Sequence, residues 1–215
     1  MTIAILLADD HRMMREGLRA LVDRQADMEV VAEAADGRTA VELSGKLKPD
    51  VVVMDLTMPE LNGIGATRQI LAAAPRARVI ILSVHADKRF ITEAFRAGAA
   101  GYVLKDGAFT ELANAIRVTV AGQTYVSPAI SGTVIEGLVG RAPSPDASAF
   151  AALTEREREI VQLIAEGKST KVVAQGLGLS VKTIETHRTN VMKKLGIRSI
   201  AELVKYAIRE GLTPP

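Results

Sequence analysis

Three aspartates at the ends of two short apolar runs are the residues of this 215-residue chain best placed to do chemistry. Asp9 and Asp10 follow the run 3–8, and Asp55 follows the run 51–54. Aliphatic runs of this length are typical of strands buried on both faces of a parallel sheet. Three carboxylates at one sheet edge would repel one another and lose hydration unless a cation neutralised them. The pattern therefore predicts a bound hard cation, which carboxylate oxygens suit, and one carboxylate that reacts.

The first 125 residues alternate strand-like and helix-like segments five times. The expected strands are Ile3–Ala8, Glu29–Ala34, Val51–Met54, Arg78–Val84 and Gly101–Leu104. The expected helices are Arg12–Asp23, Thr39–Leu47, Ala66–Ala73, Arg89–Ala97 and Thr110–Val120. This alternation predicts an α/β fold built on a doubly wound parallel sheet with right-handed crossovers. Function in such sheets gathers beyond the carboxyl ends of the strands. The polar residues that fall there are Asp9, Asp10, Asp55, Ser83 and Lys105.

Residues 140–149 have the composition of a tether, with Pro143 and Pro145 among small polar residues. Ten residues extended at about 3.1 Å each would span roughly 30 Å. The preceding segment, Ser127–Gly140, is interpreted as a short helix. We therefore expect a first domain over residues 1–125, a linker over 126–149 and a second domain over 150–215.

The second domain has an all-helical pattern. Thr154 and Glu157 match a Thr-x-x-Glu capping box that begins the first helix, and Gly167 ends it. The helices expected after it are Lys171–Leu177, Val181–Leu195 and Ile200–Arg209. The middle pair, joined by a short turn at Gly178, forms a helix-turn-helix. Such a motif places its second helix in the major groove of double-stranded DNA.

The charge of the chain is divided unevenly. Residues 1–140 hold 15 Lys and Arg against 17 Asp and Glu, whereas residues 141–215 hold 12 against 8. A basic second half is typical of a domain with a polyanionic partner. The absence of Cys excludes disulfides and thiolate chemistry. Because no apolar run approaches the ~20 residues of a membrane span and the start lacks a signal-peptide pattern, we expect a cytoplasmic protein without membrane contact.

A set of residues in both halves matches a known pattern: Asp9-Asp10, Asp55, Thr57-Met58-Pro59 with Gly63, Ser83, Lys105 and the block Leu153–Leu212. With these residues the N-terminal half resembles the receiver domain of two-component response regulators. The whole chain resembles the NarL/FixJ subfamily, which carries a LuxR-type output domain. The resemblance covers roughly residues 1–125 and 150–213.

The resemblance implies a role for each pocket residue. Asp55 would accept a phosphoryl group from a sensor histidine kinase. Asp9, Asp10, Asp55 and the backbone carbonyl of Thr57 would hold Mg²⁺. Ser83 and Lys105 would contact the phosphoryl oxygens. Tyr102 would swing inward as Ser83 engages the phosphoryl group, although a half-buried sheet aromatic that never moves fits the sequence as well.

The helix Val181–Leu195 is the expected DNA-reading element. Ile184, Val191 and Leu195 share one face and should pack inward. Candidates for contact with base edges lie on the other side: Lys182, Glu185, Thr186 and Thr189. Candidates for phosphate contact are Lys182, Thr183, Arg188, Lys193 and Lys194. His187 matches a family histidine and is assigned to phosphate contact or to packing.

Glu185 departs from the Lys that many family members have at its position. A carboxylate repels phosphate but can accept a hydrogen bond from cytosine N4. The alternative is a structural ion pair with Arg188 or Lys182 along the helix. Both interpretations stand on the sequence alone.

These observations predict a DNA-binding transcription regulator controlled by phosphorylation, and not an enzyme. Phosphorylation would release the second domain from the first and favour a homodimer. Leu203, Val204 and Ile208 of the last helix are the expected dimer contact on DNA, or else they serve only the core of their own domain. A DNA-binding regulator whose receiver is never phosphorylated is the main alternative. A phosphatase with an aspartyl-phosphate intermediate is disfavoured, because its acid–base residue would be an Asp where this chain has Thr57.

Overall fold

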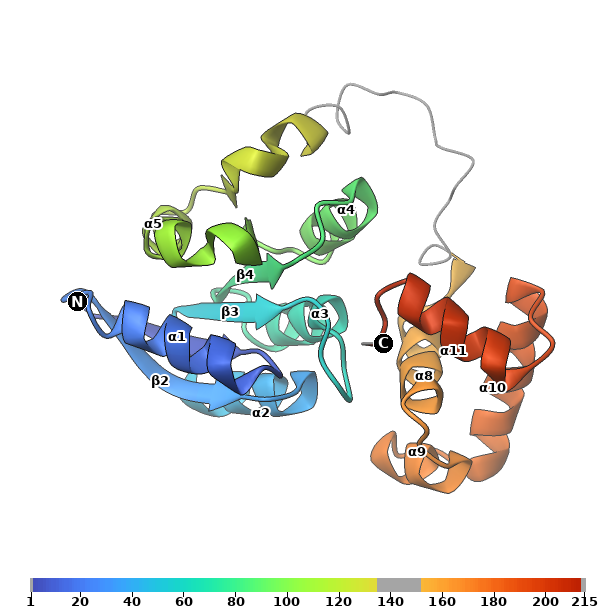
Figure 1. Ribbon diagram of the computed structural model, residues 1–215. Helices are drawn as coiled ribbons and strands as arrows, with labels where there is room; N and C mark the ends of the chain where they lie inside the picture. The colour runs from blue at the N-terminus through green and yellow to red at the C-terminus, as the bar shows by residue number, and fades with distance from the viewer. Residues whose placement is uncertain (1, 135–151, 214–215) are drawn as a thin grey trace. The chain divides into compact units, whose positions relative to one another are not determined.

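The computed structural model describes residues 2–134 and 152–213, which form two compact units (Figure 1). The N-terminal unit is an α/β sheet structure, and the C-terminal unit is helical. The predicted tether over residues 140–149 and the end of the predicted helix Ser127–Gly140 lie outside the described residues. The predicted domain limits therefore remain predictions. No helix within the described ranges has the length and apolar character that crossing a bilayer requires.

The sheet of the N-terminal unit is parallel throughout. Its strands are β1 Ile3–Ala8, β2 Met28–Ala34, β3 Val51–Asp55, β4 Arg78–Ser83, β5 Gly101–Leu104 and β6 Tyr125–Val126. Their order across the sheet is β2-β1-β3-β4-β5-β6. The five predicted strands are confirmed, each with ends within one residue of the expected ones. The sixth strand was missed, since two residues carry no periodicity.

Helices cover both faces of this sheet (Figure 1). They are α1 Arg12–Val22, α2 Gly37–Leu47, α3 Gly63–Ala73, α4 Lys88–Arg96 and α5 Ala108–Val120. Helices α1 and α5 pack over one face, and α2, α3 and α4 cover the other. Aliphatic side chains of the central strands are almost fully buried between the two helical layers. This burial on both faces is the reason that those strands are uninterrupted apolar runs.

Helices α2, α3 and α5 begin earlier than their apolar periodicity predicted, and side-chain caps explain the first two. α2 starts at Gly37 because the Asp36 side chain accepts a hydrogen bond from Thr39 N at 2.8 Å. α3 starts at Gly63 because Asn62 accepts one from Gly65 N at 2.9 Å. An N-cap side chain satisfies a free amide of the first turn whether or not that turn carries apolar residues. The first turn therefore escapes an analysis based on periodicity.

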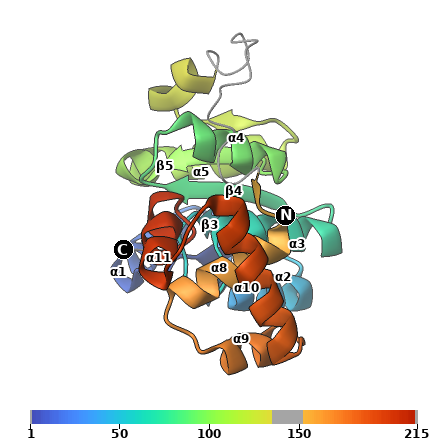
Figure 2. The same cartoon turned by 90° about the vertical axis from the view of Figure 1, so that its right-hand side faces the viewer.

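The C-terminal unit contains the helices α8 Glu155–Ala165, α9 Thr170–Gly176, α10 Val181–Leu195 and α11 Ile200–Arg209. Thr154 forms the predicted capping box with Glu157, and each later helix begins at a serine whose side chain accepts an amide hydrogen bond. The turn between α9 and α10 passes through Gly178 at φ +65°. α10 contacts both α8 and α9 (Figure 2). The predicted helix-turn-helix is thus present, with an apolar core shared by its helices.

Gly63 provides a sharp test of how closely α3 approaches β3. A Cβ at this position would lie 2.1 Å from the backbone oxygen of Asp55. We expect Gly63→Ala to lower the free energy of unfolding by about 3 kcal/mol, because backbone must shift to admit the methyl group. Urea denaturation of purified protein measures this change.

Gly45→Ala is the matched control. Gly45 lies in α2, and a Cβ there would meet nothing within 4 Å. Alanine should therefore stabilise by about 0.5–1 kcal/mol through helix propensity. Equal effects of the two substitutions would contradict the close approach at Gly63.

Candidate functional site

The predicted pocket residues meet at the carboxyl edge of the sheet. Asp9 and Asp10 follow β1, Asp55 ends β3, Ser83 ends β4 and Lys105 follows β5. These four strands are neighbours in the sheet. Asp9 and Asp55 are only 1% and 4% exposed. The structure therefore brings buried carboxylates together, as the strand ends predicted.

Lys105 is the cation of this pocket in the described residues. Its Nζ lies 2.7 Å from Asp55 Oδ2 and 2.8 Å from Asp9 Oδ2. The Lys105 side chain is only 10% exposed, so the interaction is screened little by water. One ammonium thus bridges two carboxylates but leaves a net negative charge in the pocket.

The remaining carboxylate oxygens fit a metal ion. One ligand atom each of Asp9, Asp10, His11 and Asp55 lies within 4.8 Å of all the others. Asp9 Oδ2 has the Lys105 ammonium at 2.8 Å, and Asp10 Oδ1 lies 2.7 Å from His11 Nδ1. An oxygen-rich set in which one ammonium serves three carboxylates is what a hard divalent cation binds. The backbone amide of Thr57 lies 3.4 Å from Asp55 Oδ1, while the predicted role of its carbonyl remains a prediction.

Burial and charge act in opposite directions on Asp55. Burial, followed by repulsion from Asp9, raises its pKa to about 6, although Lys105 and the Thr57 amide oppose this rise. For Lys105, burial alone would lower the pKa, but Asp55 and Asp9 outweigh it and the net pKa is raised. The ammonium therefore stays charged, whereas the Asp55 carboxyl takes up a proton at a higher pH than an exposed aspartate does. Such a carboxylate gains from any further positive charge.

Arg15 is a pocket residue that the sequence analysis missed. Its Nη1 donates a 2.6 Å hydrogen bond to the Asp9 carbonyl, and its Nε lies 3.4 Å from Glu33 Oε2. The backbone amide of His11 in turn donates to Asp9 Oδ1 at 2.8 Å. Arg15 thus ties α1 to the loop that carries the aspartates. The available signal was an arginine on the same helical stripe as the buried Leu18 and Val22.

Tyr102 is fully buried and faces inward. Its hydroxyl donates to the His85 carbonyl at 2.8 Å, and the His85 amide donates to Ser83 Oγ at 3.0 Å. Burial raises the Tyr102 pKa to about 12, so this hydroxyl stays protonated. Tyr102 is therefore more buried than the half-buried sheet aromatic considered from the sequence. The predicted swing of this side chain remains a prediction.

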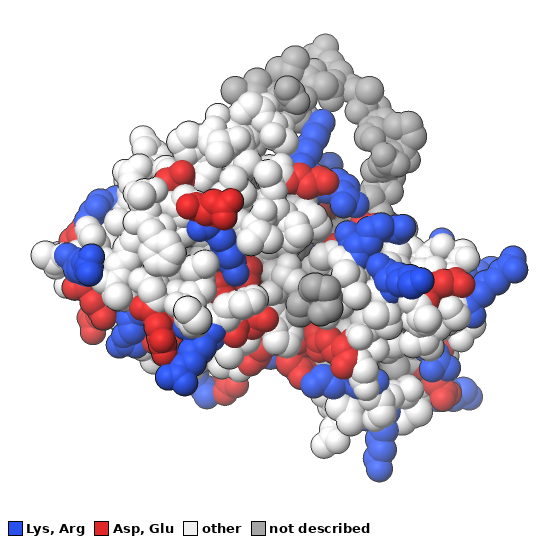
Figure 3. Space-filling view, viewed as in Figure 1, with Lys and Arg blue, Asp and Glu red and all other residues white. Residues whose placement is uncertain are grey.

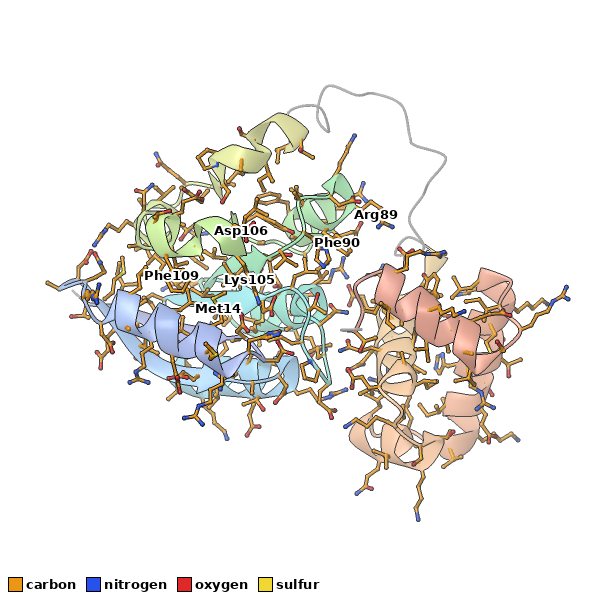
Figure 4. The ribbon with its side chains drawn as sticks, viewed as in Figure 1. Met14, Arg89, Phe90, Lys105, Asp106 and Phe109 are labelled. Carbon is orange, nitrogen blue, oxygen red and sulfur yellow. The ribbon has the colours of Figure 1, made fainter. Side chains whose placement is uncertain are left out.

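Two large apolar side chains are exposed beside the pocket. Met13, early in α1, is 86% exposed, and Phe109, early in α5, is 52% exposed. The ring of Phe109 lies against Gly17 of α1, where a Cβ would come within 3.0 Å of it. Figure 4 shows Phe109 and Met14 near Lys105 and Asp106. Exposed apolar groups next to a buried reactive site suit contact with another protein.

Helix α10 presents the two faces that its sequence predicts. Ile184 and Val191 are fully buried, and Leu195 is half-buried. All four candidates for base contact are exposed, namely Lys182, Glu185, Thr186 and Thr189. Of the other candidates, Lys193 and Lys194 are exposed, whereas Thr183, His187 and Arg188 are half-buried. Figure 3 shows basic side chains projecting from the visible surface of the C-terminal unit, with acidic ones among them.

Local contacts distinguish some of these candidates. Lys194 Nζ lies 2.7 and 2.8 Å from the two carboxylate oxygens of Glu157, so it already has an anionic partner. Thr183 bonds the capping Ser180 through its amide and its hydroxyl. The Glu185 carboxylate has no hydrogen-bond or ion-pair partner among described residues, and the structural pair with Arg188 or Lys182 is not formed there. Glu185 is therefore available to an external donor.

The predicted dimer residues on α11 differ in accessibility. Leu203 is 0% exposed, whereas Ile208 is 38% exposed and Val204 is half-buried. Leu203 supports the packing of α11 on α8. Only Val204 and Ile208 offer surface to a second copy in this conformation.

The raised pKa of Asp55 predicts how stability depends on pH without divalent cations. Between about pH 4 and 6 the folded protein binds a proton at Asp55 that the unfolded chain releases, so this group lowers stability as pH rises. We expect Asp55→Asn to raise the free energy of unfolding at pH 8 by about 1–3 kcal/mol, and much less at pH 4. Chemical denaturation in chelator at both pH values measures the difference. Equal stability of variant and wild type at pH 8 would contradict the assigned shift.

Comparison with known proteins places both units. A family model described as response regulator receiver domain matches residues 5–117, and one described as bacterial regulatory proteins, luxR family, matches residues 151–207. Over 212 residues the chain is 40% identical to the oxygen regulatory protein NreC of Staphylococcus haemolyticus, which covers 97% of this chain and 98% of that protein.

Solved structures agree with these matches. A LuxR-family two-component response regulator from Aurantimonas sp. SI85-9A1 is 44% identical with a TM-score of 0.62, covering 65% of this chain and 99% of that one. The response regulator RcsB in complex with DNA is 26% identical with a TM-score of 0.61, covering 96% and 98%. Proteins of this type are DNA-binding transcription regulators and not enzymes. With a receiver unit followed by a LuxR-type helix-turn-helix unit, this chain belongs to the LuxR family of two-component response regulators.

Proposed function

We propose that this protein is a transcription regulator switched by phosphorylation of Asp55, with a sensor histidine kinase as donor and double-stranded DNA as target. The observation that carries the proposal is the ammonium of Lys105 bonded to both Asp9 and Asp55 in a buried pocket. A cation beside the reacting carboxylate can neutralise the oxygens of an incoming phosphoryl group. Phosphoryl transfer depends mainly on such charge neutralisation and on positioning. Because the kinase and DNA are the proposed partners, we propose that the protein acts in the cytoplasm.

The reaction forms one bond and breaks another. An Asp55 carboxylate oxygen attacks the phosphorus of a phosphohistidine, and the phosphorus–nitrogen bond breaks with its electron pair passing to nitrogen. Lys105, already 2.7 Å from Asp55, neutralises a phosphoryl oxygen as charge shifts onto it. Ser83, at the end of the neighbouring strand, supplies a hydroxyl donor to another oxygen.

We propose Mg²⁺ as the cation of the carboxylate set. Asp10, Asp55 and Asp9 would hold it, which fits their clustered ligand atoms. When bound, Mg²⁺ supplies positive charge to the attacking carboxylate and to the phosphoryl oxygens. Once Asp55 becomes an acyl phosphate its carboxylate charge is lost, and Lys105 with the divalent ion then outweighs the negative charge of Asp9 and Asp10. A phosphoryl dianion can therefore be accommodated.

A protein donor must reach Asp55 from outside the sheet edge. Met13 and Phe109 flank this edge on α1 and α5 and expose apolar surface. We propose this surface as the contact for the kinase domain that carries the phosphohistidine. The small-molecule donor acetyl phosphate needs no such contact and therefore reports on the pocket alone.

Incubation with acetyl phosphate and a magnesium salt should add one phosphoryl group per chain, detected by intact mass. Asp55→Asn should abolish the mass gain, and Lys105→Ala should slow it about 100-fold, since a charge that neutralises the transition state is lost. Asp106→Asn, at the exposed residue next to Lys105, is the matched control and should be labelled like the wild type. Labelling of Asp55→Asn to wild-type extent, or DNA regulation without any labelling, would favour the unphosphorylated alternative.

The C-terminal unit supports the DNA-binding half of the proposal. The exposed positions on one face of α10 form two pairs four residues apart, Lys182 with Thr186 and Glu185 with Thr189. A helix of this kind reads base edges from its N-terminal turns. Because Lys194 is paired with Glu157, phosphate contact would rest first on Lys182, Arg188 and Lys193. Two copies would bind half-sites about one helical turn apart, joined through Val204 and Ile208.

Glu185→Ala tests whether this carboxylate reads a cytosine. Since Glu185 has no partner among described residues, its removal should cost little folding stability. It should relax the preference at one base pair by about 1–3 kcal/mol and leave the other positions unchanged. Binding-site selection with the wild type and Glu185→Ala measures the preference. Glu202→Ala is the control, because it removes a carboxylate of α11 that accepts a hydrogen bond from the Arg198 amide at 2.9 Å. Identical selected sequences for wild type and Glu185→Ala would contradict the proposal that Glu185 reads a cytosine.

A further inference from the structure

The segment that leaves the receiver unit begins with β6, which pairs with β5, the strand directly before Lys105. β6 pairs in parallel with β5, with Tyr125 opposite Gly101 and Val126 opposite Tyr102. The Ser127 amide then donates to the Tyr102 carbonyl at 2.9 Å. Ser127 is fully buried. Residues 125–127 therefore belong to the sheet, although they also begin the segment that leads to the C-terminal unit.

The Ser127 side chain is the centre of a small polar network. Its Oγ accepts a hydrogen bond from Leu104 N at 3.1 Å and donates one to Glu111 Oε2. The Tyr125 hydroxyl donates to the same Glu111 oxygen at 3.3 Å. We call the pair Ser127 and Glu111 the latch.

The latch closes on the turn that holds Lys105. Leu104 immediately precedes Lys105, and the 3₁₀ turn Lys105–Gly107 has no side-chain cap of its own. The carboxylate of Glu111 lies over Gly107, where a Cβ would come within 2.6 Å of its Oε1. Both ends of the turn are thus in contact with the latch. Figure 4 labels Lys105 and Asp106 on this turn, beside Phe109 at the start of α5.

The hydroxyl of Ser127 takes the place of a missing strand partner. β6 ends at Val126, so the Leu104 amide has no further ladder bond from that edge. A buried amide left without a partner is costly, and the Ser127 side chain provides the acceptor. Without it, the backbone that enters the Lys105 turn would lose its fixed direction.

We propose that Ser127 and Glu111 are positioning residues for Lys105, so that the segment leaving the receiver unit sets the rate of phosphoryl chemistry at Asp55. This inference rests on the proposed phosphorylation of Asp55. Lys105 reaches Asp55 and Asp9 through a long flexible side chain, and its reach depends on where the turn places its Cα. A displacement well under the length of a hydrogen bond is enough to weaken transition-state stabilisation.

The test compares variants of the full-length protein labelled with acetyl phosphate and a magnesium salt. Ser127→Ala and Glu111→Ala should slow labelling of Asp55 about 3- to 10-fold, which corresponds to the loss of one hydrogen bond's worth of positioning. Hydrogen exchange at the Leu104 amide should accelerate about 10-fold in Ser127→Ala, since that amide loses its acceptor. Glu111→Gln, which keeps the size and one acceptor oxygen, should restore most of the rate.

Tyr125→Phe is the matched control. It removes a hydroxyl bonded to the same carboxylate but has no bond to Leu104, so both the labelling rate and Leu104 exchange should stay within about twofold of wild type. Slowed labelling in Tyr125→Phe equal to that in Ser127→Ala would show a general loss of stability and overturn the proposal. Normal labelling in Ser127→Ala despite accelerated Leu104 exchange would also overturn it.

Failure of the proposed function gives a different result. If the wild type is not labelled at Asp55, the phosphorylation proposal fails and the positioning role fails with it. If the wild type is labelled at Asp55 and the latch variants are labelled at the same rate, the phosphorylation proposal stands and the role of the latch is rejected. Leu104 exchange requires no labelling and decides in either case whether the latch holds the turn.

Discussion

The receiver unit is organised around one ammonium shared by two buried carboxylates. Lys105, which follows β5, pairs with Asp55 across the end of β4 and with Asp9 across the ends of β4 and β3. Removing three charges from water is costly, and mutual attraction offsets that cost only when the geometry is held well. The sheet holds it by placing every partner at the end of a strand. A parallel sheet with a different order would separate these groups.

The charge in the pocket is left unbalanced. Asp10 adds a carboxylate that Lys105 does not reach within salt-bridge distance in the described residues, and burial raises the pKa of Asp55 to about 6. A residual negative charge favours a cation more than a neutralised pocket would. The proposed switch of Asp55 between two ionic states is in keeping with this imbalance of charge.

The C-terminal unit uses the same kind of pair for a different purpose. Glu157 completes the capping box of α8 and also pairs with Lys194 near the end of α10. Burial acts to raise the Glu157 pKa, but the hydrogen bond from Lys194 and those from Thr154 outweigh it, so the net pKa is lowered. This contact joins the start of α8 to the end of α10. It fixes the direction of α10, the helix proposed to read base edges.

The sequence predicted those parts of the fold that repeat a pattern over many residues. The central strands could be predicted because both of their faces are buried, and the pocket because parallel strands end on one edge. The starts of α2 and α3 could not, since a single cap at Asp36 or Asn62 decides them. Arg15 was missed because it bonds a backbone carbonyl, and a backbone acceptor leaves no signal in the sequence. The accessibility of Leu203 depends on packing between helices and could not be read from α11 alone.

The edge of the sheet shows why the shortest strand matters. Without β6, β5 would be an edge strand, and its backbone amides would face water next to Lys105. Two residues of pairing, followed by the Ser127 hydroxyl, cover that edge as far as Leu104. The cover comes from the chain that leaves the unit and not from a helix or a loop within it. The turn that holds Lys105 is therefore bounded on one side by the sheet and on the other by the beginning of the connection to the DNA-binding unit.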